Sequence, residues 1–152
     1  MSIDARLKEL GITLPDAPKP VANYVPAVRS GNLVFVSGQV SAAGGIAVKG
    51  KLGEGVSLED GQKAARLCAL AILAQVNATV GSLDKVKRIV KLGGFVACAP
   101  EFDQHPAVIN GASDLMVDVF GDKGKHARFA VGVPSLPLGF AVEIDAVVEV
   151  EA

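Results

Sequence analysis

Apolar and polar residues alternate most regularly near the end of the chain, between residues 142 and 150. Every even-numbered residue there is apolar, whereas Glu143, Asp145 and Glu149 stand between them and only Val147 breaks the pattern. A period of two is typical of a strand with one buried face. The pattern therefore predicts a strand that turns Glu143 away from the core.

Shorter apolar stretches predict further strands. They are expected at 25–29, 33–40, 87–99 and 127–133, with a short strand between the glycines at 44–45 and the glycine-rich loop at 50–55. Ser30-Gly31-Asn32 is a turn signal between the first two strands. Gly93-Gly94 marks either a bulge or a close approach of backbone.

Helix signals lie between these strands. Ser57-Leu58-Glu59-Asp60 is a capping-box pattern, and the Ala- and Leu-rich helix that it opens extends to about Thr79 and stops near Gly81. Pro106 suits the first turn of a second helix, which carries apolar residues toward the core: Val108, Ile109, Leu115, Met116 and Val119. The order β-β-β-α-β-α-β-β predicts an α/β (α+β) fold with two main helices on one face of a sheet.

The first twenty residues are expected to form an appendage that packs on this domain. Apolar residues recur at helical spacing between Ser2 and Leu10, and Gly11 is placed as a C-terminal stop. Three prolines then make an extended connector that fits neither a helix nor a central strand: Pro15, Pro18 and Pro20. We therefore divide the chain into an N-terminal helix with a Pro-rich connector, 1–20, and one domain, 21–152.

Composition adds an expectation about assembly. Of the 152 residues, 50% are hydrophobic and 20% are charged, so more apolar surface is present than a small monomer usually buries. The longest apolar run, Leu67 to Ala74, is far shorter than the ~20 residues that a membrane-spanning helix needs. We therefore expect no membrane partner, and expect partner subunits to cover the open face of the sheet.

Charge and cysteine content narrow the class of function. The net charge is −1 and no basic cluster is present, which argues against a nucleic-acid partner. The N-terminus lacks the basic start and apolar core of a secretory signal. Cys68 and Cys98 stand alone in apolar segments, as buried free thiols of a reducing compartment do. These features indicate a cytoplasmic protein.

Several kinds of catalytic site find no support in the sequence. His105 and His126 are the only histidines, and neither has a second ligand at a useful spacing, so no metal site is expected. The two histidines are interpreted as loop residues that flank a helix or a strand. The chain has no G-x-S-x-G elbow, and the glycine-rich loop lacks the Lys-Ser/Thr ending of a phosphate cradle.

Two positions favour binding of a small molecule. Phe129, Val131 and Val133 alternate as a core face, so Arg128 leaves the opposite face beside the small residues Ala130 and Gly132. An arginine in such a setting suits a bidentate grip on a carboxylate, or else a structural salt bridge to Glu143 on the neighbouring strand. Periodicity does not choose between these two.

Ser37-Gly38 ends an apolar strand, where the backbone can approach a small ligand. A simple bend of the chain is the alternative explanation for such a pair.

Four segments together resemble the signature of the RidA/YjgF family, also called the endoribonuclease L-PSP family. They are Val34-Phe35-Val36-Ser37-Gly38-Gln39, His126-Ala127-Arg128, Leu136-Pro137 and Val142-Glu143-Ile144-Asp145-Ala146. They occur in family order, and the resemblance covers roughly residues 22–150. It implies a chorismate-mutase-like fold, a homotrimer and three clefts between subunits.

The same resemblance implies an activity: hydrolytic deamination of reactive 2-imino and enamine acids to 2-keto acids and ammonia, without metal or organic cofactor. It implies that Arg128 binds the substrate carboxylate and that Glu143 positions and polarises the attacking water. It also implies that substrate-binding positions fall on Tyr24, Ser37, Gly38 and Asn110, and on Ala130 through its backbone carbonyl.

The chain departs from many members of that family at two places. They have Pro-Ala-Arg with Cys two residues after the Arg, where this chain has His126 and Ala130. These differences, together with the N-terminal helix and the longer loop at 50–55, indicate a divergent subgroup. Two alternatives stay open. One is a non-catalytic module that binds a small carboxylate and regulates a partner, and the other is an endoribonuclease, against which the near-zero net charge argues.

Overall fold

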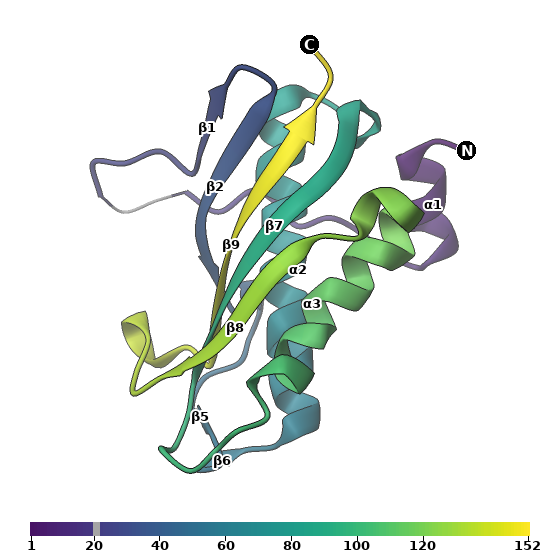
Figure 1. Cartoon of the computed structure of the whole chain (residues 1–152). Helices are drawn as coiled ribbons and strands as arrows, with labels where there is room; N and C mark the ends of the chain where they lie inside the picture. Colours follow the sequence, from purple (N-terminus) through teal and green to yellow (C-terminus); the bar gives the residue numbers. More distant parts are fainter. Residues whose placement is uncertain (20–21) are drawn as a thin grey trace.

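Two long helices pack on one face of a five-stranded sheet in the computed structural model, which describes residues 1–19 and 22–152 (Figure 1). The main elements are β1 (Ala27–Ser30), β2 (Leu33–Val40), α2 (Leu58–Val80), β7 (Val86–Ala97), α3 (His105–Phe120), β8 (Ala127–Val133) and β9 (Val142–Val150). The strand order is β1-β2-β9-β7-β8. Neighbouring strands are antiparallel, except that β7 and β8 are parallel. The predicted α/β class and the positions of these seven elements are confirmed.

The expected third strand is replaced by two small ladders outside the main sheet. In one, β3 (Ala42–Ala43) pairs with β4 (Ile46–Ala47), and in the other β5 (Lys51–Leu52) pairs with β6 (Gly55–Val56). Gly44 and Gly45 both have positive φ, 59° and 82°, and reverse the chain between β3 and β4. The reversal leaves each strand only two residues long, which explains why no full third strand forms.

Helix α2 begins and ends where its sequence predicts. The hydroxyl of Ser57 accepts a hydrogen bond from the Asp60 N–H at 3.1 Å. Gly81 adopts a φ of 88°, and its N–H donates to the carbonyl of Asn77. α2 packs against α3 at Gly111, where an added Cβ would lie 2.1 Å from the Gln62 carbonyl oxygen. The helices therefore contact each other through backbone at this point.

The N-terminal helix α1 (Ile3–Glu9) packs on the domain, beside the C-terminal part of α3 (Figure 1). The Ile3 N–H donates to the Asp84 carboxylate at 2.7 Å, and the Arg6 side chain donates to the Asp118 carbonyl at 2.8 Å. Leu7 is buried in the core. Pro20 and the boundary predicted between residues 20 and 21 lie outside the described residues.

The two faces of the sheet differ in what covers them. The even-numbered residues of β9 are buried under the helices, as the alternation predicts, and Glu143 lies on the other face. That other face, called the free face below, is uncovered in the single chain. It carries apolar side chains that are 37–51% exposed: Val28, Phe35, Phe129 and Val131.

The assignment of Phe129 and Val131 to the core face is therefore wrong for one chain. Arg128, Ala130 and Gly132 lie instead on the helix side of β8, next to α3. Alternation along β8 correctly groups these residues, but it does not tell which group the helices cover.

Gly93 and Gly94 mark a close approach rather than a bulge, because both are in register with β9. A Cβ at Gly93 would lie 2.7 Å from the Phe129 ring on the free face, and one at Gly94 would lie 2.7 Å from Ile109 of α3. The register shifts of β7 occur earlier, before Lys91. In the described parts of the chain no helix has both the length and the apolar character needed to cross a membrane.

Candidate functional site

Arg128 lies on the helix side of the edge strand β8 and is held by α3. Its Nη1 donates to the hydroxyl of Ser113 at 3.1 Å, and its Nη2 donates to the carbonyl of Pro106 at 3.2 Å. A guanidinium has five N–H donors, so three remain for another group. Within residues 1–19 and 22–152 Arg128 forms no ion pair. The structural salt bridge is therefore absent from the described chain, and the guanidinium has donors to offer a ligand.

Asn110 and Ala130 lie around this arginine. Asn110 is exposed and stands three residues before Ser113 on α3, so helical spacing puts the two on the same side of the helix. Ala130 follows Arg128 on the same side of β8 and is half-buried. Arg128, Asn110 and Ala130 are here called the arginine half-site.

Glu143 lies on the free face, where β9 pairs with both β2 and β7. Its carboxylate occupies the space above Gly38, since a Cβ at that position would lie 2.1 Å from Glu143 Oε2. Burial raises the pKa of the Glu143 carboxyl above its usual value, and the nearby Asp145 carboxylate raises it further. Among the described residues no cation pairs with Glu143. The carboxylate is thus partly desolvated without a compensating positive charge.

A hollow of about 350 Å³ opens beside Glu143. Tyr24 and Gly38 line it together with Glu143, and Leu138 and Phe140 form part of its apolar wall. The short helix η3 (Pro137–Gly139) supplies Leu138, which has a positive φ of 56° and a side chain that is 81% exposed. Tyr24, Gly38 and Glu143 with this hollow are here called the glutamate half-site.

Ser37 supports the glutamate half-site through two hydrogen bonds to the backbone of the preceding segment. Its hydroxyl donates to the carbonyl of Val25 at 2.9 Å, and its N–H donates to the carbonyl of Pro26 at 2.9 Å. These bonds fasten the segment that carries Tyr24 to strand β2, at the register shift between Val36 and Gln39. The Ser37 hydrogen is therefore engaged with backbone, and only its oxygen lone pairs are left to a ligand.

The two half-sites do not meet within one chain. Strand β7 lies between β8 and β9, so the expectation that Glu143 is on the strand next to Arg128 is wrong. The separation is two strand spacings, roughly 10 Å, plus an offset of roughly 10 Å along the strands. The two side chains also leave opposite faces of the sheet. Each half-site therefore lacks the group of opposite charge that the other contains.

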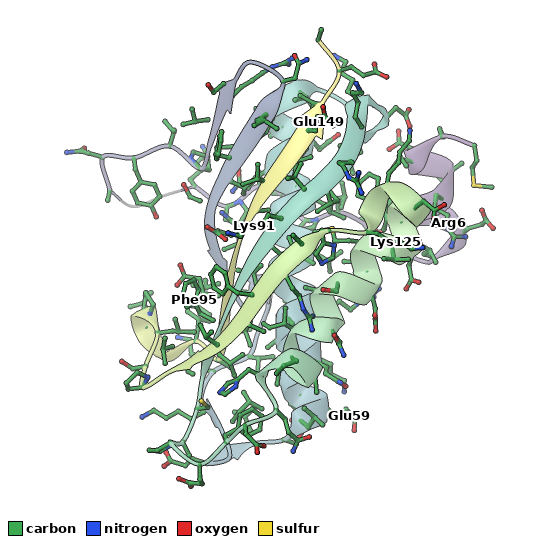
Figure 2. The ribbon with its side chains drawn as sticks, in the orientation of Figure 1. Arg6, Glu59, Lys91, Phe95, Lys125 and Glu149 are labelled. Carbon is green, nitrogen blue, oxygen red and sulfur yellow. The ribbon has the colours of Figure 1, made fainter. Side chains whose placement is uncertain are left out.

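The free face next to the glutamate half-site is partly aromatic. Lys91 and Phe95 project from the sheet on the side away from the long helices (Figure 2). The Phe95 and Phe129 rings meet edge to face with their centroids 5.3 Å apart, and Lys91 Nζ lies 5.5 Å from the Phe129 ring centroid. This mixture of rings and charged ends suits a surface that contacts protein.

A larger hollow, of about 440 Å³, lies at the C-terminal ends of β7 and β8 and contains none of the predicted site residues. Cys98 and His105 line it, with Cys98 Sγ 3.4 Å from His105 Nε2. Burial raises the pKa of the Cys98 thiol, which keeps the sulfur protonated and a poor nucleophile. We therefore take the two half-sites as the candidate site, because charged groups and predicted residues coincide there. Nowhere in the described ranges do three His, Cys, Asp or Glu side chains gather as metal ligands would.

Two residues that support the arginine half-site are not singled out as functional by the sequence. Ser113 contacts Arg128 directly, and His126 contacts Ser113 at 2.8 Å. Two features of the sequence could have pointed to them: Ser113 is three residues after Asn110, and His126 is two residues before Arg128. His126 lies in a loop before β8, as the sequence predicted, but its contact with Ser113 was not predicted.

Replacing Gly38 with alanine should disable the glutamate half-site while leaving the fold in place. The new Cβ would lie 2.1 Å from Glu143 Oε2, so the carboxylate must move away. A displacement of about 1 Å at a reacting group can lower a rate by about 10²-fold, which is the decrease in kcat that we expect. The control is Gly38→Ala in a Glu143→Gln background, where it should have no further effect on kcat. An additional loss in that background would contradict this explanation.

Comparisons with known proteins agree with this architecture. The model of the YjgF/chorismate mutase-like family, which also carries an endoribonuclease name, matches residues 4–149. The chain is 50% identical over 150 residues to Protein TCP17 of Trypanosoma cruzi, covering 97% of this chain and 93% of that protein. It is 31% identical over 142 residues to a protein of Dermatophagoides farinae named 2-iminobutanoate/2-iminopropanoate deaminase, covering 92% and 95%.

A crystal structure of similar shape is also known. It is that of Atu1372, a protein of unknown function from Agrobacterium tumefaciens, which is 54% identical to this chain. The TM-score is 0.91, and the match covers 98% of this chain and 92% of that one. Together with the fold and the motif residues around Ser37, Arg128 and Glu143, these matches show that the chain belongs to the YjgF/chorismate mutase-like family, the RidA/YjgF family that its motifs resemble.

Proposed function

We propose that this protein hydrolyses small 2-imino acids and their enamine tautomers to 2-keto acids and ammonia. The observation that carries the proposal is the placement of a guanidinium with spare donors and a desolvated carboxylate without an ion pair in two half-sites on opposite faces of one sheet. A second copy of the chain would place its arginine half-site next to the glutamate half-site of the first. The relative from Dermatophagoides farinae, which is named as a deaminase of this kind, supports the choice of chemistry.

The proposed assembly is a homotrimer with three identical clefts. The free face leaves four apolar side chains exposed by 37–51%, which is the surface a closed assembly would cover. Glu143 forms no ion pair within the described chain, although Lys19 lines the same hollow, and Arg128 of a second copy would supply a partner. Apolar cover and charge complementarity therefore favour the same arrangement.

In such a cleft each residue has a chemical role. The fork of Arg128 binds the substrate carboxylate and orients the planar imine, whereas Tyr24 and Asn110 line the cleft. Glu143 removes a proton from water while the water oxygen bonds to the imine carbon. Glu143 returns this proton to the nitrogen, which gives a carbinolamine. The hydroxyl proton is then transferred to the nitrogen, the C–N bond breaks, the carbonyl forms and ammonia leaves. Burial raises the pKa of the Glu143 carboxyl in the single chain, so its carboxylate is a stronger base there than that of an exposed glutamate.

The remaining predicted positions complete the cleft. Ser37 keeps the Tyr24 segment in place, and Gly38 leaves room for the carboxylate. The backbone carbonyl of Ala130 is available to the water, so the missing thiol at that position does not prevent the reaction. An imine carbon is already electrophilic, and the reaction needs no metal or organic cofactor.

A coupled assay tests the proposal. An amino-acid oxidase generates 2-imino acids in the presence of semicarbazide, which traps them as semicarbazones. The protein should lower the amount of semicarbazone formed and raise the rate of 2-keto acid release. If several amino acids, each supplied to its oxidase, give unchanged semicarbazone, the deaminase proposal is overturned. Saturable binding of 2-keto acids without turnover would then assign the cleft to a carboxylate-binding module.

A further inference from the structure

A continuous chain of hydrogen bonds leads to Arg128 from the loop before β8. The Gly124 carbonyl oxygen lies 2.6 Å from His126 Nδ1, and His126 Nε2 lies 2.8 Å from the Ser113 hydroxyl. The Ser113 hydroxyl in turn accepts from Arg128 Nη1 at 3.1 Å. The chain joins the short helix η2 (Gly121–Gly124), the start of β8 and the middle of α3. It therefore connects the guanidinium to backbone that lies outside the candidate site.

For a neutral His126 ring, the chemistry of these groups gives a direction to every bond. A carbonyl oxygen only accepts, so the proton of a neutral His126 ring is on Nδ1. His126 Nε2 is then an acceptor, and Ser113 must donate its only hydroxyl hydrogen to it. The lone pairs of Ser113 remain to accept from the guanidinium, which can only donate. With this tautomer each donor is matched with an acceptor.

The starting point of the chain is held rigidly. Gly124 is buried, and a Cβ there would lie 2.1 Å from the Met116 carbonyl oxygen and 2.9 Å from the Val117 Cα. Only glycine permits this contact between η2 and α3, and the contact sets where the Gly124 carbonyl points. The carbonyl, the ring and the hydroxyl then leave Arg128 Nη1 one favourable position.

We propose that Ser113 and His126 are positioning residues that hold the Arg128 fork in one orientation for the carboxylate of its ligand; this rests on the proposed function. A free arginine side chain has many rotamers, and binding a ligand must select one of them. Ser113 and the Pro106 carbonyl hold Nη1 and Nη2 before the ligand arrives. His126 keeps the Ser113 lone pairs turned toward the arginine. The Arg128 rotamer is therefore chosen during folding. Because the ligand does not have to order the side chain, the affinity for a carboxylate rises.

We expect variants of Ser113 and His126 to differ in their affinity for a carboxylate according to the hydrogen bonds that they keep. Ser113→Ala should weaken binding of 2-oxobutanoate, the probe, by about tenfold and raise KM equally, with kcat little changed. Ser113→Thr keeps the hydroxyl and should restore both values. His126→Gln places an amide near the former Nε2 and should be mild. His126→Asn reaches only the Gly124 carbonyl and should behave like Ser113→Ala.

The experiment measures calorimetric affinity for 2-oxobutanoate, KM, kcat and thermal unfolding for these four variants and for Arg128→Ala. Asp114→Ala, at an exposed neighbour on α3, is the matched control and should bind as wild type does. The expected result is tenfold weaker binding in Ser113→Ala and His126→Asn at an unchanged unfolding temperature, with recovery in Ser113→Thr.

The other outcomes distinguish a failure of the proposed function from a failure of the positioning role. If Arg128→Ala binds the keto acid as wild type does, the carboxylate anchor of the proposed function fails, and the positioning role fails with it. If Arg128→Ala loses binding while Ser113→Ala and His126→Asn keep wild-type affinity, the positioning role alone is overturned. The positioning role is also overturned if Ser113→Ala loses kcat without a change in KM, or if Ser113→Thr does not recover.

Discussion

Replacing Glu143 with glutamine is expected to lower kcat for imine hydrolysis by about 10²–10⁴-fold, which is the range attributed to a positioned general base. The amide has the shape of the carboxyl group and still fits above Gly38, but it cannot take a proton from water. KM should change little, since the carboxylate of the substrate is bound by another residue. The measurement is steady-state release of 2-keto acid from oxidase-generated imines. A variant with more than a tenth of wild-type kcat would remove Glu143 from the role of base.

The pH dependence of kcat/KM provides a second test of Glu143 as the base. The base acts in its ionised form, so kcat/KM falls as the pH drops through the pKa of Glu143. Burial and Asp145 raise that pKa in the chain, so the fall should begin at a higher pH than an exposed glutamate would give. The guanidinium of a second copy opposes this rise, so Arg128→Ala should move the fall to a higher pH than in the wild-type assembly. Glu143→Gln should remove the fall altogether, and an unchanged profile in that variant would assign it to another group.

Replacing Arg128 with alanine is expected to lower kcat/KM by roughly 10–150-fold, mainly through KM. The reason is the loss of charge-assisted hydrogen bonds to the carboxylate, worth about 1.5–3 kcal/mol. Arg128→Lys keeps the charge without the planar fork, so it should recover only part of the loss. Arg66→Ala, at an exposed position of α2, is the control and should leave both constants unchanged. Wild-type KM in Arg128→Ala would contradict the carboxylate grip.

Mixing Arg128→Ala with Glu143→Gln tests the division of the site between copies. When Arg128→Ala and Glu143→Gln chains are unfolded together and reassembled in equal amounts, about one cleft in four receives both native residues. The rate at substrate concentrations well below KM should therefore rise to about a quarter of the wild-type value. Each variant reassembled alone should keep its own lower rate. If the mixture shows only the average of the two lower rates although the assemblies form, the two residues do not share a cleft.

The order of elements could be predicted because local signals were strong. The Ser57 cap, the Gly81 stop and the alternation in β9 each correspond to a contact in the structure. The prediction of a third strand was wrong because the paired glycines at 44–45 reverse the chain after two residues. A sequence shows that glycines end a strand, but it does not show whether the next segment returns to the same sheet.

The candidate site was predicted residue by residue, but its spatial arrangement was not. Alternation in 127–133 groups Arg128 with Ala130 and Gly132, yet the face on which the helices pack depends on contacts with α3. The insertion of β7 between β8 and β9 is a property of strand order. Strand order arises from long-range pairing, which periodicity does not record. The hydrogen-bond chain through His126 and Ser113 could not be foreseen, because it needs α3 and η2 to be in contact.

The docking of α1 has a practical consequence for handling the protein. α1 is attached to the outer side of α3 through Arg6 and Asp118, on the helix side of the molecule (Figures 1 and 2). A protein or affinity tag fused ahead of Ser2 would therefore emerge away from the free face of the sheet. Immobilisation through such a tag would leave that face open to solution. The fused protein could then be used to capture untagged copies and to record how fast they join and leave.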